Sequence, residues 1–266
     1  MPEPRTPVVF IHGLWLHSTS WEPWLELFRE NGYEPVAPRW PMEPATVAEA
    51  RANPDLVANQ GLAQVVEHFK AFVVTLPSKP IIIGHSFGGL ITELLMGEDL
   101  GLAGVAIDPA QIKGVLPLPL AQLKAGLPAL GNPANINKAV ALTEKEFKYG
   151  FGNALSAEES GELFAAWSIP SPVRGLFEVA AANFNPHAPN KVDTHNNDRG
   201  PLLLISGSAD HTAPAVTTKS AFKLYRHSTA TTELESFEGR GHTIALDHGW
   251  KDVASSVLAW LKDQNL

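Results

Sequence analysis

The sequence predicts an α/β fold, with a doubly wound, mostly parallel sheet that carries a mostly helical insertion. Short apolar segments alternate along the chain with amphipathic segments of helical period, which indicates the sheet and its covering helices. Several of the short segments are apolar at successive positions, as is typical of strands covered on both faces. Residues 111–199 contain no convincing strand, which indicates the insertion.

Six segments are expected to form the sheet. Five are apolar and bounded by turn residues, while the sixth alternates between apolar and polar residues and is expected nearer an edge. In chain order the five are residues 8–13, 33–40, 80–86, 102–110 and 201–210, and the alternating segment is residues 231–237.

Three helices are indicated by apolar residues at helical spacing. The first is expected to be capped by Ser20 and to end before Gly32. The second spans residues 61–75 and the third residues 250–264, each with one apolar face. Such helices between parallel strands are expected to cover the faces of the sheet.

The strand-free segment is too long to be a loop. A structureless stretch of this length inside a compact domain is implausible, and residues 157–167 have helical spacing. We therefore expect a core made of residues 1–110 and 200–266, with residues 111–199 forming a cap over the sheet.

Composition restricts the class of protein. The 266 residues are 44% hydrophobic and 18% charged, which suits a globular protein with a sizeable core. The net charge of −8 and the lack of a basic run argue against a nucleic-acid-binding surface. Cysteine is absent, so disulfides and thiol nucleophiles are excluded. No signal peptide and no apolar run of the ~20 residues that span a membrane is recognised, so a cytoplasmic protein is expected.

The most informative motif is the sequence GHSFG at residues 84–88, between an expected strand and an apolar helical pattern. A sharp turn from strand to helix exposes the Ser86 hydroxyl, and small flanking residues let other backbone approach. The backbone N–H of Phe87 would then face the position of an oxyanion. This context predicts a nucleophilic serine, and the alternative is a tightly packed glycine-rich turn.

A nucleophilic serine needs a base, and the base needs an acid that orients it. Among ten histidines, His242 is favoured because it lies in the loop after the last expected strand, and His248 is its closest rival. Asp210 ends the fifth expected strand, where its carboxylate could hold one His242 nitrogen while the other nitrogen faces Ser86. Asp108 is the rival acid, since it also ends a strand, although it could instead be a turn residue.

The order Ser86, Asp210, His242, together with the sequence HGLW at residues 12–15, resembles the α/β-hydrolase family. The resemblance covers almost the whole chain and implies that the backbone N–H of Leu14 is a second oxyanion donor. Two departures are visible. The family's first antiparallel hairpin is missing, and the oxyanion loop lacks the HGGG sequence of the acetylcholinesterase-like and hormone-sensitive branches.

The resemblance implies a serine hydrolase that cleaves an ester, lactone or thioester through an acyl-enzyme, with water as second reactant. No cofactor is implied, and the chain has no recognisable metal motif. Trp15, His85 and His211 are the candidates for the substrate pocket, and apolar cap residues favour a small-to-medium hydrophobic substrate. Two alternatives stay open: a cofactor-free lyase or oxygenase, and a ligand-binding receptor with little turnover.

Overall fold

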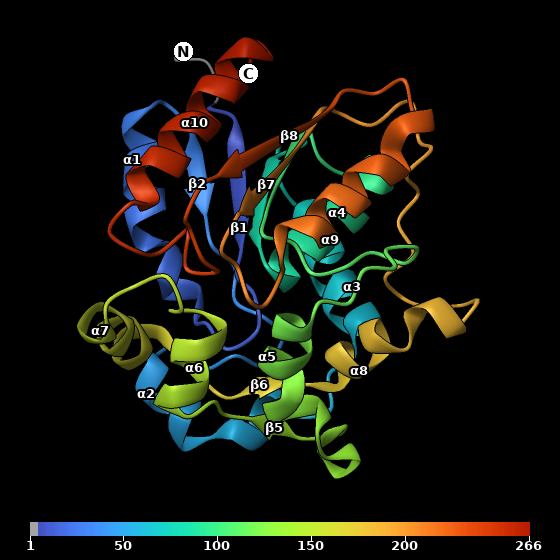
Figure 1. The fold of residues 1–266 in the computed structure, drawn as a ribbon. Coiled ribbons are helices and arrows are strands. Elements are labelled where there is room, and N and C mark those ends of the chain that lie inside the picture. The colour runs from blue at the N-terminus through green and yellow to red at the C-terminus, as the bar shows by residue number, and fades with distance from the viewer. Residues whose placement is uncertain (1–4) are drawn as a thin grey trace.

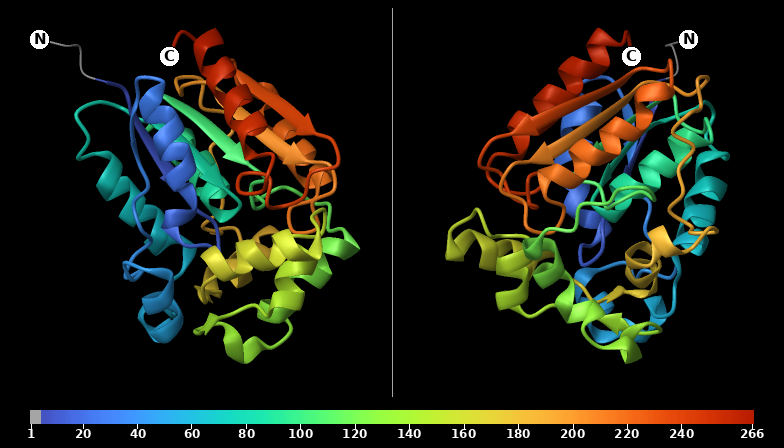
Figure 2. Two further views of the ribbon diagram at one scale, coloured as in Figure 1. Left: turned by 90° about the vertical axis from the view of Figure 1, so that its left-hand side faces the viewer. Right: turned by 45° about the vertical axis from the view of Figure 1, so that its right-hand side comes forward.

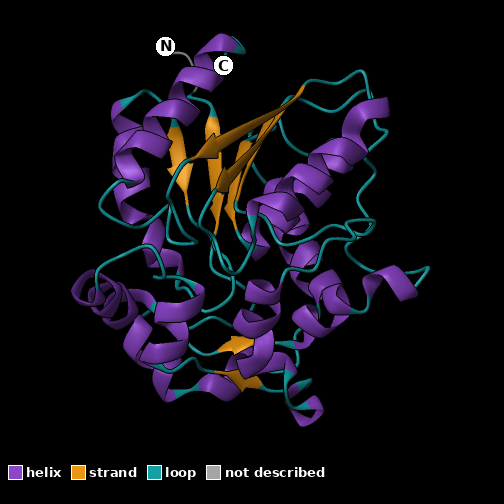
Figure 3. Cartoon of the chain, in the orientation of Figure 1, coloured by secondary structure: helices purple, strands orange, loops and turns teal. Residues whose placement is uncertain are grey.

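A computed structural model of the protein describes residues 5–266. Its centre is a six-stranded sheet in the order β2-β1-β3-β4-β7-β8, in which every neighbouring pair is parallel (Figure 1; Figure 3). The α/β fold predicted from the sequence is therefore confirmed. The strands are β1 (Pro7–Ile11), β2 (Glu34–Val36), β3 (Ile81–His85), β4 (Ala103–Ile107), β7 (Leu202–Gly207) and β8 (Thr232–Phe237).

Burial along the strands follows their apolar patterns. All residues of β1, β3, β4 and β7 are buried, because these strands are covered on both faces. The partly exposed β8 lies at one edge of the sheet, as its alternating pattern predicts, and β2 lies at the other edge. The carboxyl ends of all six strands consequently lie on the same side of the molecule.

Helices cover both faces of this sheet, and Figure 2 shows the two layers in turn. On one face, α1 (Glu22–Glu30) and α10 (Trp250–Asp263) pack together, with the rings of Trp24 and Trp250 6.0 Å apart. The opposite face is covered by α3 (Leu62–Val73), α4 (Phe87–Gly97) and α9 (Ala215–Leu224), which a 3-10 turn, η5 (Tyr225–His227), extends. In residues 5–266, no helix is long and apolar enough to cross a membrane.

The start of α1 differs from the sequence-based expectation. Ser20 does not cap this helix but lies buried within a preceding 3-10 helix, η1 (Ser18–Trp21). The cap of η1 is the side chain of His17, which accepts a hydrogen bond from the Thr19 N–H. Pro23 in the first turn of α1 explains the later start, since proline is favoured there.

Within residues 111–199, the stretch from 120 to 184 is mostly helical and lies at the carboxyl ends of the strands (Figure 1). The segment then returns to the start of β7, where Arg199 donates to the carbonyl oxygens of Gly200 and Thr231. Two strands of two residues each also occur and pair antiparallel, which the sequence analysis did not anticipate because so short a strand has no recognisable alternation. The helix predicted at residues 157–167 is present with those bounds. The elements are α5 (Leu120–Leu130), η3 (Pro133–Asn135), β5 (Ala139–Val140), α6 (Glu144–Gly150), α7 (Ala157–Trp167), β6 (Ser171–Pro172), α8 (Arg174–Ala180) and η4 (Ala182–Phe184).

The connection between β2 and α3 also reaches this side of the molecule, through α2 (Val47–Ala52) and η2 (Pro54–Val57). From α2, the Arg51 guanidinium donates to the backbone carbonyls of Phe164, Ala165 and Ser168 at 2.8–2.9 Å. These carbonyls lie at the carboxyl end of α7, where a cation is favoured by the helix dipole. Arg51 therefore fastens α7 to the part of the chain that precedes α3.

Candidate active site

Ser86 lies at a strained turn between β3 and α4. Its φ of 56° falls in the left-handed region, which a serine adopts only when the surrounding structure holds it there. Gly84 and Gly88, two positions to either side of Ser86, have no room for a side chain. A Cβ on Gly84 would lie 2.0 Å from the Gly88 carbonyl oxygen, and a Cβ on Gly88 would lie 1.9 Å from the Ile11 carbonyl oxygen. The local sequence therefore produces the sharp strand-to-helix turn that it predicts, with Ser86 buried in the wall of a cavity and not open to solvent.

Ser86, His242 and Asp210 form one chain of hydrogen bonds from the ends of three different strands. His242 Nε2 lies 2.9 Å from Ser86 Oγ, and His242 Nδ1 lies 2.6 Å from Asp210 Oδ2. Because the carboxylate can only accept, Nδ1–H donates to Asp210 and Nε2 is left to accept from the serine hydroxyl. All three residues are buried, so these bonds form in a low dielectric.

Asp210 remains ionised despite its burial. Burial acts to raise its pKa, but attraction to His242, the hydrogen bond from His242 and the hydrogen bond from the Ala213 N–H outweigh it and lower the pKa. The second oxygen, Oδ1, accepts from the N–H groups of Thr212 and Ala213 at 2.6 and 2.9 Å. This loop therefore holds a carboxylate in the orientation that His242 requires.

Asp108, the rival acid, lies behind this pair and does not hydrogen-bond a histidine. Its Oδ1 accepts from the Gly207 N–H at 2.7 Å, and its side chain is fully buried. Burial and repulsion from Asp210 raise the pKa of Asp108 well above its usual value. The protonated form of Asp108 is therefore favoured beside the carboxylate of Asp210.

His85 and His211 were expected to line the substrate pocket, but their side chains bond elsewhere. The His85 Nε2–H donates to the His242 carbonyl oxygen at 2.8 Å, and burial followed by repulsion from His242 lowers the pKa of His85 to about 3. A neutral His85 thus supports the histidine loop. The Nδ1 of His211 lies 3.0 Å from the Tyr149 carbonyl oxygen. His248, the rival base, is exposed and pairs with Glu159 at 2.9 Å, away from the serine.

The loop after β1 packs directly against the serine. A Cβ on Gly13 would lie 2.6 Å from Ser86 Cβ and 3.1 Å from Ser86 Oγ, so only glycine allows this approach. In residues 5–266, the Leu14 N–H makes no hydrogen bond to another backbone group. The Phe87 N–H belongs to the first residue of α4, where helix N–H groups have no partner within the helix. Two N–H groups next to the serine are therefore free to bind an oxygen.

A buried carboxylate that sequence reasoning missed holds this loop. Glu43 Oε2 lies 2.7 Å from His12 Nε2, and Glu43 Oε1 accepts from the Ser18 N–H at 3.2 Å and lies 3.5 Å from His17 Nε2. Burial acts to raise the pKa of Glu43, but attraction and hydrogen bonding to His12, with the nearby His17 and Ser18, lower it to about 2. The contacts join residues that are 25 to 31 positions apart, and no local pattern marks them.

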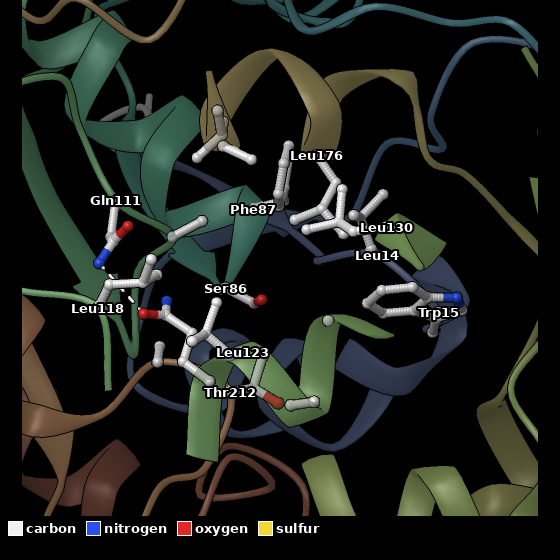
Figure 4. A pocket seen from close by; sticks show the side chains of 17 residues that line it. Leu14, Trp15, Ser86, Phe87, Gln111, Leu118, Leu123, Leu130, Leu176 and Thr212 are labelled. Carbon is white, nitrogen blue, oxygen red and sulfur yellow. Dashed lines mark hydrogen bonds between the residues drawn. The ribbon is translucent and has the colours of Figure 1, made fainter. Parts of the chain in front are cut away.

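A cavity beside Ser86 is enclosed by the core on one side and by α5 and α8 on the other (Figure 4). Its walls are mostly apolar, and the amides of Gln111 and Gln122, which hydrogen-bond each other at 3.2 Å, form a polar side. Trp15, an expected pocket residue, lines it, whereas His85 and His211 are not among its walls. The apolar lining consists of Leu14, Trp15, Phe87, Ala110, Leu118, Leu123, Ala125, Gly126, Leu130, Leu176, Val179, Ala180 and Ala213.

Among the described residues, one buried group has the spacing of a metal site: ligand atoms of His85, Asp108 and His242 lie within 4.8 Å of one another. Both nitrogens of His242 already bond Ser86 and Asp210, and His85 Nε2 bonds a carbonyl oxygen. Among the described residues, His85 Nδ1 and Asp108 Oδ2 have no partner, which leaves two donors and not the three that such a site needs. The group therefore does not fit a metal ion while His242 holds Ser86 and Asp210.

A model of the alpha/beta hydrolase family matches residues 8–256. The chain belongs to this family. The resemblance seen in the sequence is thereby confirmed, and the match includes the serine turn, the acid loop and the histidine loop of this α/β hydrolase. Among curated proteins, none matches the chain.

Solved structures similar to this α/β hydrolase extend over nearly its full length. A monoacylglycerol lipase from Paleococcus ferrophilus is 20% identical with a TM-score of 0.64, over 97% of this chain and 95% of that one. A thermophilic esterase from Thermogutta terrifontis is 16% identical with a TM-score of 0.65, over 98% and 90%. A mutant of tomato methylketone synthase I is 16% identical with a TM-score of 0.67, over 97% and 98%. At such identities the likeness demonstrates a shared fold and leaves the reaction to the site.

Proposed function

We propose that the protein is a serine hydrolase that cleaves an ester, or a related lactone or thioester, through an acyl-enzyme. The proposal rests on one observation, the unbroken chain of hydrogen bonds from Ser86 through His242 to Asp210. A serine hydroxyl bonded to a buried histidine, which a carboxylate orients, is the arrangement that activates a nucleophile.

In the first half-reaction, Ser86 Oγ attacks the substrate carbonyl carbon while its proton passes to His242 Nε2. Asp210 stays ionised and stabilises the histidine cation that forms. The carbonyl electrons move to the oxygen, where the N–H groups of Leu14 and Phe87 are placed to donate. Such donors contribute about 3–4 kcal/mol to the transition state. The tetrahedral intermediate then expels the alcohol, which takes the proton from His242 and leaves the acyl group on the serine.

In the second half-reaction, water replaces the alcohol. His242 accepts a proton from the water as it attacks the acyl carbon, and the same two N–H groups bind the new oxyanion. When this intermediate collapses, the bond to Ser86 Oγ breaks and the proton returns to the serine. The acid product leaves, and the enzyme is restored.

The cavity supports a small-to-medium hydrophobic substrate. Its leucine, alanine and valine walls bury apolar groups at about 25 cal/mol per Å² of surface removed from water. Trp15 and Phe87 flank the serine, so an apolar acyl group beside them is favoured. The Gln111 and Gln122 amides in the cavity wall offer polar groups for an oxygen or nitrogen of the substrate.

The proposal is tested by incubating the protein with a fluorophosphonate and with a series of p-nitrophenyl esters. We expect one covalent adduct on Ser86 and turnover of short-to-medium esters. The Ser86→Ala variant is expected to lose both while melting near the wild-type temperature, and Ser255→Ala, an exposed serine on α10, serves as the matched control.

The other outcomes separate the competing functions. An adduct without turnover of any ester would favour a ligand-binding receptor. Absence of an adduct would favour a cofactor-free lyase or oxygenase that uses the histidine only as a base. Equal ester turnover by Ser86→Ala and the wild type would refute the proposed nucleophile.

A further inference from the structure

The loop that carries the Leu14 N–H is bonded to the cap segment, residues 111–199, along its next three residues. Leu16 forms an antiparallel bridge with Ser168. On either side of this bridge, the Ile169 N–H donates to the Trp15 carbonyl and the His17 N–H donates to the Trp167 carbonyl, both at 3.1 Å. The backbone that follows α7 therefore pairs with the oxyanion loop through hydrogen bonds.

Trp15 also donates two hydrogen bonds to the cap segment. Its backbone N–H donates to Ser171 Oγ at 2.6 Å, and its indole N–H donates to the Val140 carbonyl at 3.0 Å. Val140 and Ser171 lie directly opposite each other in the β5–β6 pair. The short strands β5 and β6, which the sequence did not predict, thus hold Trp15 of the oxyanion loop between them, and we call this arrangement the clamp.

The clamped residue has a strained backbone. Trp15 has a φ of 63°, which a bulky non-glycine residue adopts only when its surroundings impose it. Trp15 and Ser171 are both buried, so without the serine hydroxyl the Trp15 N–H would lose its acceptor in a place where water does not replace it. The Ser171 hydroxyl therefore lowers the free energy of the strained conformation relative to relaxed alternatives.

We propose that Ser171 is a positioning residue through which the cap segment sets the geometry of the oxyanion hole. The inference rests on the proposed serine-hydrolase function. Leu14, whose N–H is the proposed donor, lies between Gly13, packed against Ser86, and Trp15, held by Ser171. With both neighbours fixed, the direction of the Leu14 N–H is fixed as well. Ser171 acts on the reaction only through this loop and touches no reacting atom.

The first test is steady-state hydrolysis of p-nitrophenyl esters by Ser171→Ala. An oxyanion donor acts in the transition state, so we expect kcat to fall about ten- to a hundredfold while KM changes less than about twofold. The pH profile is expected to keep its shape, because the bonds of His242 are untouched. Ser171→Thr, which retains the hydroxyl, is expected to recover most of the lost kcat.

The matched control is Ser168→Ala, because Ser168 meets the same loop through its backbone bridge. This variant is expected to keep the wild-type kcat. Equal kcat for the two alanine variants would overturn the proposal. A rise in KM with unchanged kcat would overturn it as well, because Ser171 would then shape the substrate pocket and not the oxyanion hole.

A second measurement separates this inference from the proposed function. Hydrogen exchange of the Trp15 amide is expected to be faster in Ser171→Ala than in the wild type, whether or not any ester is turned over. If the wild type neither hydrolyses esters nor reacts with a fluorophosphonate, the proposed function fails and exchange alone decides whether Ser171 holds the loop. Unchanged exchange at Trp15 would refute the clamp.

Discussion

Replacing Glu93 with glutamine is expected to stabilise the protein at neutral pH. Glu93 lies on α4, the helix that begins directly after Ser86, and its side chain is fully buried. Its Oε2 accepts from the Tyr225 hydroxyl at 2.7 Å, and Oε1 has no partner among the described residues. Burial raises the pKa of Glu93 from 4.5 to about 8, although the hydrogen bond from Tyr225 and the charge of Arg199 oppose the rise.

The magnitude follows from proton linkage. A carboxyl whose pKa is higher in the folded state stabilises the fold below its unfolded pKa of 4.5 and loses that contribution as the pH rises toward 8. Each pH unit in this interval costs about 1.4 kcal/mol, so the loss between pH 4.5 and pH 7 amounts to about 3 kcal/mol. A glutamine at this position still accepts the Tyr225 hydroxyl and does not titrate.

The assay is urea unfolding of the wild type and of Glu93→Gln at several pH values from about 5 to 8. The difference in the free energy of unfolding is expected to grow in favour of the variant as the pH rises. Glu67→Gln, at an exposed position on α3, is the matched control and should leave the wild-type slope unchanged. Parallel curves for Glu93→Gln and the wild type over this range would refute the reasoning.

Two further predictions concern carboxyl groups at the site: one compares Asp210 with Asp108, and the other concerns Glu43. Asp210→Asn is expected to lower kcat for esters about ten-thousandfold, because an amide does not hold and stabilise the His242 ring as the carboxylate does. Asp108→Asn is expected to lower kcat less than about tenfold, because a neutral carboxyl and an amide are similar in shape and charge. Glu43→Gln is expected to lower the free energy of unfolding at pH 7 by about 3 kcal/mol, because the pKa of Glu43 is held at about 2. The stability from Glu43 is present above pH 4.5 and lost as the pH falls toward 2, so its sign is opposite to that of Glu93.

Kinetics of the two aspartate variants side by side check the first of these. A larger loss for Asp108→Asn than for Asp210→Asn would mean that Asp108 is the acid of the triad. Urea unfolding of Glu43→Gln at pH 7 and near pH 3 checks the second. A destabilisation that does not shrink at the lower pH would contradict the ion-pair account of the oxyanion loop.

Much of the candidate site was readable from the sequence because its parts are local. The turn around Ser86 depends on glycines two positions away on either side, so its geometry is written in five consecutive residues. Asp210 and His242 follow strands, and parallel strands place their carboxyl ends at one edge, where such residues meet. This reasoning predicted which residues come together, and the distances of 2.6 and 2.9 Å agree with it.

Other features of the molecule depend on neighbours that are distant in the chain, and some expectations about them failed. Asp108 and Asp210 both follow strands, and only their three-dimensional surroundings raise the pKa of the first and lower the pKa of the second. His85 is the last residue of β3 and directly precedes Ser86, yet its ring bonds the His242 carbonyl and does not line the cavity. Ser20 has the composition of a helix cap, but the 3-10 turn before α1 takes that place.

The sequence alone was sufficient for the α/β fold, the serine turn and the order of the three hydrogen-bonded residues, because each follows from local periodicity or from the ends of parallel strands. The tertiary structure decided how the oxyanion loop is held. Glu43 reaches it from 25 or more positions away, and Ser171 reaches Trp15 across 156 positions. Contacts of that separation arise only when distant parts of the chain pack together, and the residues next to either partner in the sequence give no sign of the other.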